Sequence, residues 1–235
     1  MSKICLIQQP AGIGDIFFIQ KIAKRFINEG YDVWIPVIRE FEFIKDYIKV
    51  PHLHFVAEYE NFPYKNLYGG GSSAVYRMEN EDLFLPIQNF DRNFPGLSVM
   101  VAKYKMLGMD HSDWLDYFEF ERNIEREKTL INHLNPEGKE FILVNRQFGS
   151  PPDSKPCPHM GEYENAIEMR YLGWDNLFDW IGLAMQAKEI HTVETSLVYI
   201  LHKLGLQNIT VYSRHNPPSF TQVEGFFNKN WNYIK

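Results

Sequence analysis

The chain has 235 residues, enough for one large domain or two small ones, and a formal net charge of −6. The negative charge excludes a general electrostatic attraction to nucleic acid or to an anionic membrane, so we expect no nucleic-acid partner. The sequence has no run of about 18 apolar residues, and we therefore expect no membrane span.

Alternating strands and helices are predicted in the N-terminal half. The apolar run over residues 4–7 predicts a buried strand over 4–8, and the 3.6-residue spacing over 16–28 predicts a helix that ends at Gly30. The same analysis predicts further strands over 33–37, 54–57 and 74–78, and helices over 41–48, 97–107 and 124–133. This alternation is typical of a parallel sheet with crossover helices.

A second alternation follows a turn near residues 135–138. Strands are predicted over 141–145, 166–171, 190–193 and 209–212, helices over 176–187 and 196–204, and a proline-rich loop over 149–158. The predicted fold class is therefore α/β, with two small Rossmann-like lobes over residues 1–135 and 136–235. Open sheets of this class bind ligands at the carboxyl ends of their strands.

The first predicted strand runs directly into a glycine turn and then a helix. Gly12 and Gly14 allow the backbone to approach a ligand closely, and the helix start directs unpaired N–H groups into the same space. Asp15 follows them at the helix start. An acid there would repel an anion, so the turn is better suited to a hydroxyl or a proton than to a phosphate.

Two common nucleotide motifs do not fit this turn. A dinucleotide fingerprint needs a third glycine three residues after Gly14, where the chain has Phe17. A phosphate-binding P-loop needs a Gly-Lys-Ser or Gly-Lys-Thr ending, which is not in the sequence. A nicotinamide-dependent oxidoreductase therefore becomes the least favoured alternative, and no cofactor is predicted.

The run Gly12-Ile13-Gly14-Asp15 after the first strand resembles the N-terminal motif of glycosyltransferase family 9, the heptosyltransferase-like enzymes of the GT-B fold. Residues 176–204 resemble the family's later helix, strand, Asp-Thr-Gly and helix segment, with Glu194-Thr195-Ser196 in place of Asp-Thr-Gly. The chain departs from the family in its shorter length and in lacking the histidine that usually follows this segment.

The resemblance implies a two-lobed transferase that moves a sugar with inversion from a nucleotide-sugar donor to an acceptor hydroxyl. The acceptor would bind the lobe 1–135 and the donor the lobe 136–235. Asp15 would be the general base that takes the proton of the attacking hydroxyl. The alternative for Asp15 is an ordinary helix cap, worth about 1 kcal/mol.

Four residues of the second lobe are candidates for donor binding. Thr195 and Ser196 open a helix whose N–H groups and hydroxyls suit a diphosphate, while Glu194 suits a ribose hydroxyl. Arg146 follows the strand 141–145, where a guanidinium can neutralise a leaving diphosphate without a metal. An ordinary N-cap and a surface salt bridge are the competing interpretations of these positions.

The leading prediction is thus a metal-independent glycosyltransferase. The alternative is a non-catalytic protein of the same fold that binds a nucleotide or a sugar. The two cysteines, Cys5 and Cys157, offer neither a disulfide framework nor a zinc spacing, which favours a reducing, cytoplasmic setting.

Overall fold

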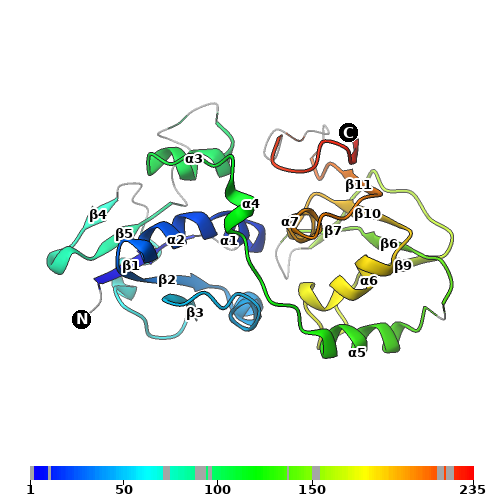
Figure 1. The fold of residues 1–235 in the computed structure, drawn as a ribbon, viewed down its shortest axis with the longest axis horizontal. Coiled ribbons are helices and arrows are strands. Elements are labelled where there is room, and N and C mark those ends of the chain that lie inside the picture. Colours follow the sequence, from blue (N-terminus) through cyan, green and yellow to red (C-terminus); the bar gives the residue numbers. More distant parts are fainter. Residues whose placement is uncertain are drawn as a thin grey trace. The chain divides into compact units, whose positions relative to one another are not determined.

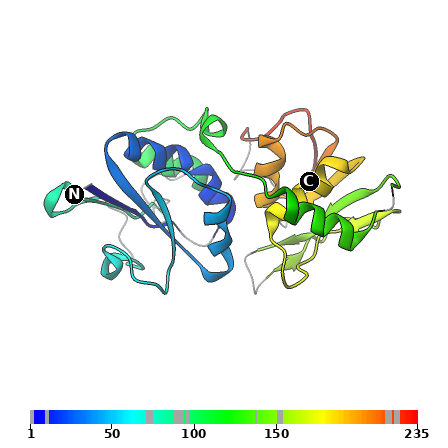
Figure 2. The same cartoon turned by 60° about the horizontal axis from the view of Figure 1, so that its bottom comes forward.

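The computed structural model describes residues 3–9, 12–70, 75–87, 94, 97–136, 138–149, 154–215, 220 and 225–235. The chain divides into two compact units, Met1–Glu121 and Arg122–Lys235. Each unit contains a five-stranded sheet with helices (Figure 1), as the α/β prediction requires. The division falls before the predicted boundary after residue 135, because α5 (Ile124–Leu134) contacts α6 (Ile181–Gln186) in the second unit, as Figure 2 also shows.

The first unit is arranged around β1 (Lys3–Ile7), whose neighbours are β2 (Tyr31–Val37) on one side and β5 (Leu83–Leu85) on the other. β3 (Leu53–Ala57) pairs with β2, and these four strands are parallel. β4 (Tyr76–Arg77) closes the far edge antiparallel to β5. The sequence analysis did not predict β5, because three apolar residues in a row are too short to show a period.

The helices of the first unit have other bounds than those predicted from the sequence. The predicted helix 16–28 begins earlier and breaks into α1 (Ile13–Phe18) and α2 (Gln20–Asn28) at Ile19. The remaining helices are α3 (Val99–Met106) and α4 (Trp114–Tyr117), and the 3₁₀ segments are η1 (Arg39–Asp46), η2 (Lys65–Leu67) and η3 (Glu79–Glu81). The predicted helix 41–48 is thus a 3₁₀ segment.

Aromatic side chains fill the core of the first unit. Phe17 stacks on Phe118 with ring centroids 4.7 Å apart, and Phe18 contacts Tyr104 edge-on at 5.0 Å. The Tyr104 hydroxyl donates a hydrogen bond to the Phe18 carbonyl (2.5 Å), so this buried hydroxyl has a partner. The contacts between Phe18 and Tyr104 hold α3 against α1, the helix on which Asp15 lies.

The second unit has a fully parallel main sheet. In spatial order its strands are β12 (Asn232–Ile234), β11 (Ile209–Tyr212), β10 (Glu189–Val193), β6 (Ile142–Asn145) and β9 (Ala166–Glu168). A small antiparallel pair, β7 (Gln147–Phe148) and β8 (Lys155–Pro156), follows β6. The strand β12 was not predicted from the sequence.

Helices of the second unit include α5, α6 and α7 (Ser196–Lys203). The predicted helix 176–187 is a 3₁₀ turn, η5 (Leu177–Trp180), that runs into α6. Asn176 caps this turn, and its side chain accepts a hydrogen bond from the Phe178 N–H (3.0 Å).

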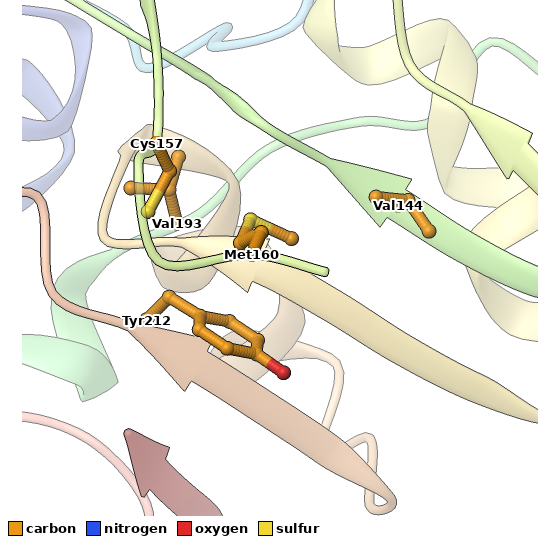
Figure 3. Close-up of a cluster of buried hydrophobic side chains, with 5 residues drawn as sticks. All are labelled: Val144, Cys157, Met160, Val193 and Tyr212. Atoms are coloured by element: carbon orange, nitrogen blue, oxygen red, sulfur yellow. The ribbon is translucent and has the colours of Figure 1, made fainter. Parts of the chain in front are cut away.

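One face of the second sheet packs against the chain segment that follows β8. Val144, Val193 and Tyr212 from three neighbouring strands form a buried cluster with Cys157 and Met160 (Figure 3). Ile190 and Thr192 lie on the opposite face of β10, because successive side chains of a strand alternate between faces.

Each sheet has one point at which its chain order reverses. In the first unit β1 leads to β2 and β3 on one side, whereas β5 lies on its other side. In the second unit the reversal lies between β6 and β10. Crevices at such switch points, outside the carboxyl ends of the strands, are where open α/β sheets bind ligands.

Among the helices that the structure describes, none is long and apolar enough to cross a membrane. Both cysteines are free thiols, and both are buried.

The link between α5 and η5 provides a test of the second unit's stability. Arg126 forms a bidentate pair with Asp179, with N–O distances of 2.8 and 2.6 Å, and Asp179 is fully buried. Replacing Arg126 with Met leaves a buried carboxylate without its counter-charge, so we expect a loss of about 3 kcal/mol in the free energy of unfolding. Urea unfolding monitored by circular dichroism measures it.

Lys128→Met on the same helix is the matched control, because Lys128 pairs with Glu125 on the exposed surface. We expect a change within about 0.5 kcal/mol for this variant. Equal effects of the two substitutions would contradict the assignment of the Arg126 pair as a stabilising link.

Candidate functional site

Asp15 lies in the first turn of α1, directly after the end of β1. Gly12 is the N-cap residue of this helix and has an extended backbone (φ −158°), which any residue can adopt. A Cβ atom on Gly12 would lie 2.3 Å from Asp15 Oδ2, so a larger residue at this position would require the Asp15 carboxylate to move. Gly14 is half-buried in the same turn of the helix.

A lysine from α3 holds the Asp15 carboxylate. Lys103 Nζ forms an ion pair with Asp15 Oδ1 and donates a hydrogen bond to Gln9 Oε1 (2.7 Å). The Lys103 side chain is fully buried, whereas the Asp15 side chain is 28% exposed. The carboxylate thus lies between a buried ammonium group and solvent, at the switch point of the first sheet.

The sequence analysis missed Lys103. Its sequence signal is a single cation inside the apolar run Val99–Tyr104, on a helix that otherwise has no polar residue over that stretch. A lysine in such a position is buried only when it has a partner. The sequence does not identify the partner, because Asp15 lies 88 positions away.

At the switch point of the second sheet, Asn145 links β6 to the segment after β10. Its side-chain Nδ2 donates to Thr192 Oγ1 and to Thr195 Oγ1, both at 3.0 Å. Thr195 was a predicted site residue, whereas Asn145 and Thr192 were not. Their strands were predicted, but the pairing of β6 with β10 is a tertiary property.

Glu194 lies beside this network and is 3% exposed. Its backbone N–H donates to the Tyr212 carbonyl (2.9 Å), yet neither carboxyl oxygen has a hydrogen-bond partner among the residues that the structure describes. Burial raises the pKa of Glu194 to about 7, and the charge of Arg214 opposes this rise only in part. A buried carboxyl group in this state has unused hydrogen-bonding capacity that a ligand hydroxyl could satisfy.

Thr195 is the N-cap residue of α7, and Ser196 is its first residue. Within the described part of the chain, the Thr195 side chain makes no capping hydrogen bond; its hydroxyl accepts from Asn145 instead. The first N–H groups of α7 are therefore not capped by that hydroxyl, and they carry the positive end of the helix dipole. This end suits an anionic group such as a phosphate.

Arg146 directly follows β6, as predicted, and its guanidinium group makes several contacts within its own unit. It donates to Glu168 (2.8 Å) and to the carbonyls of Met160 (3.0 Å) and Gly161 (2.7 Å). The hydrogen bond to Glu168 is the main reason that the pKa of Arg146 is raised. These contacts favour a role in holding the segment 160–168, and the predicted diphosphate contact stays a prediction.

No cluster of three or more His, Cys, Asp or Glu side chains suited to a metal ion occurs among the described residues.

No protein-family model matches the sequence, and no curated protein matches it. Among solved structures, the chain is similar to a glycosyl transferase family 9 protein from Veillonella parvula DSM 2008, with a TM-score of 0.53 and 9% identity. That comparison covers 99% of this chain and 86% of the other. The similarity shows a shared fold and confirms the predicted GT-B-like architecture.

Two structures of the glycosyltransferase TibC are also similar. One, the iron-containing dodecameric enzyme from enterotoxigenic E. coli H10407, has a TM-score of 0.48 and 13% identity over 90% of this chain and 60% of TibC. The other, TibC in complex with ADP-D-β-D-heptose, has a TM-score of 0.46 and 12% identity over 90% and 58%.

The buried carboxyl group of Glu194 predicts a specific pH dependence of stability. Its pKa is about 7 in the folded protein against 4.5 as its ordinary value, so the folded state holds the proton more tightly between these two values. This contribution is complete below about pH 4.5 and is lost as the pH rises through 7. Between about pH 5 and pH 8, we expect wild type to lose about 2–3 kcal/mol more unfolding free energy than Glu194→Gln.

Urea unfolding at both pH values measures this difference. Glu164→Gln, at an exposed position of the same unit, is the control and should follow the wild-type pH dependence. Parallel pH dependences of wild type and Glu194→Gln would show that Glu194 ionises in the folded protein as readily as in the unfolded chain.

Proposed function

We propose that the protein is a glycosyltransferase that moves a sugar from a nucleotide-sugar donor to an acceptor hydroxyl. The observation that carries the proposal is the buried Glu194 carboxyl group at the switch point of the second sheet, without a partner among the described residues. Leaving such a group unsatisfied costs about 1–3 kcal/mol, which a ligand hydroxyl would recover. The fold shared with a family 9 glycosyltransferase supports the same conclusion.

The donor would bind the second unit. Glu194 forms a hydrogen bond with a ribose hydroxyl, and the start of α7 at Thr195 and Ser196 holds the diphosphate. Asn145 orients the Thr195 hydroxyl through its hydrogen bond. Arg146 is a further candidate for the diphosphate, provided that the ligand replaces one of its present contacts.

The acceptor would bind the first unit at the start of α1, where Gly12 and Gly14 leave the backbone accessible. Asp15 takes the proton of the acceptor hydroxyl while that oxygen attacks the anomeric carbon. The bond from the anomeric carbon to the diphosphate breaks, and the nucleoside diphosphate leaves with the electron pair. A single displacement of this kind inverts the anomeric centre, and the helix dipole and Arg146 would stabilise the leaving group in place of a metal.

A cytoplasmic setting belongs to the same proposal. The free thiols of Cys5 and Cys157 support a reducing compartment, where nucleotide sugars would be the donors.

A ligand screen with the full chain tests the binding half of the proposal. Thermal shifts would be measured with UDP-, GDP-, dTDP- and ADP-sugars, including the ADP-heptose that TibC binds. A ligand at 100 times its dissociation constant adds about 2.7 kcal/mol of stability, which is easily seen. Release of nucleoside diphosphate from the ligand that binds then tests turnover.

Asp15→Asn tests the catalytic half. The amide retains the size of the side chain and loses its basicity, so we expect transfer to fall by at least about a hundredfold while donor binding is unchanged. Asp116→Asn is the matched control, because Asp116 is an exposed acid in the first turn of α4 and should leave transfer unchanged. Donor binding without any turnover that depends on Asp15 would instead support the non-catalytic alternative.

Arg146→Ala tests the leaving-group contact. A lost charged hydrogen bond should weaken binding of the nucleoside diphosphate by about 10- to 100-fold and leave binding of the nucleoside unchanged. Calorimetry with both ligands measures this, and the exposed Arg170→Ala of the same unit is the control. Equal weakening of both ligands would assign Arg146 to the support of the segment 160–168.

A further inference from the structure

The lysine beneath Asp15 is not explained by packing alone. Lys103 is among the largest fully buried side chains of the described residues, and it lies on a helix whose neighbouring Ala102 and Tyr104 are also buried. Transferring an ammonium group out of water costs several kcal/mol unless it is paired. An apolar residue would fill the same space without this cost, so packing does not explain why a charged residue lies at this position.

Two oxygen atoms from the segment after β1 receive the ammonium group. Gln9 Oε1 accepts a hydrogen bond at 2.7 Å, and Asp15 Oδ1 forms the ion pair. Burial lowers the pKa of Lys103, while the charge of Asp15 and its hydrogen bond oppose this change. Among the residues that the structure describes, Asp15 supplies the opposite charge beside Lys103, and Gln9 adds an uncharged acceptor.

The second carboxylate oxygen occupies the space beside Gly12. A Cβ atom on Gly12 would lie 2.3 Å from Asp15 Oδ2, so a side chain there would displace the carboxylate. One oxygen is thus bound by Lys103, and the lack of a side chain at Gly12 leaves room for the other. The side chain is nevertheless 28% exposed, so the group is accessible to an acceptor from the solvent side.

We propose that Lys103 is a positioning residue, which fixes the orientation of the Asp15 carboxylate for proton transfer. This inference rests on the proposed role of Asp15 as the base. The ion pair with Lys103 holds Asp15 Oδ1 in one place, and proton transfer from a hydroxyl requires a carboxylate that is aligned in this way.

Lys103→Met tests this inference, since methionine fills a similar volume without the charge. We expect kcat to fall by about 10- to 100-fold with little change in KM, because the carboxylate loses its orientation. Lys105→Met, two positions along the same helix and exposed, should change neither quantity.

A second readout does not depend on turnover. A crystal structure of Lys103→Met should show the Asp15 carboxylate in a different or mixed orientation, whereas Lys105→Met should keep the wild-type orientation. A chain that transfers no sugar would refute the proposed function, yet these structures would still decide whether Lys103 orients Asp15. An unchanged carboxylate orientation in folded Lys103→Met, or an unchanged kcat, would overturn the positioning role.

The wild-type chain provides a third measurement if Lys103→Met does not fold. The nitrogen-15 signal of the Lys103 ammonium group should show a scalar coupling through the hydrogen bond to the carboxyl carbon of Asp15. A Lys103 signal without this coupling would overturn the inference without any substitution.

Discussion

Parallel strands can be joined only by a crossover, and this constraint determines where polar groups meet in both units. At some point in the sheet, the connections that leave two neighbouring strands run to opposite sides. These connections diverge and open a crevice at the carboxyl ends of the two strands. In the first unit this place lies between β1 and β5, and Asp15 follows β1 there. In the second it lies between β6 and β10, where Asn145 bonds to Thr192 and Thr195.

Removal from water has different outcomes for two buried charged groups, Lys103 in the first unit and Glu194 in the second. Lys103 is fully buried and has Asp15 and Gln9 as partners, so its cost is offset inside the protein. Glu194 is as deeply buried and its carboxyl oxygens have no partner in the described part of the chain, so its pKa rises to about 7. The cation is thus satisfied within the protein, whereas the carboxyl group keeps unused hydrogen-bonding capacity.

Most elements could be predicted because their signals are local. The strand 209–212 agrees with β11, and the helix 124–133 differs from α5 by one residue at its end. The short strands β5 and β12 carry too few residues for a period, and their place depends on pairing with β1 and β11. The helix break at Ile19 could not be predicted either, because no proline or glycine lies there.

The sequence by itself determined the alternation of strands and helices, the glycines before Asp15, and the polar segment Glu194-Thr195-Ser196 at a helix start. These features depend on neighbours a few positions apart, which hydrophobic periodicity and capping preferences report. Only the tertiary structure decided that Lys103 pairs with Asp15, that Asn145 orients Thr195, and that Arg146 contacts the segment 160–168. The physical reason is that ion pairs and hydrogen bonds depend on distance in space, and these partners are brought together by packing between elements far apart in the chain.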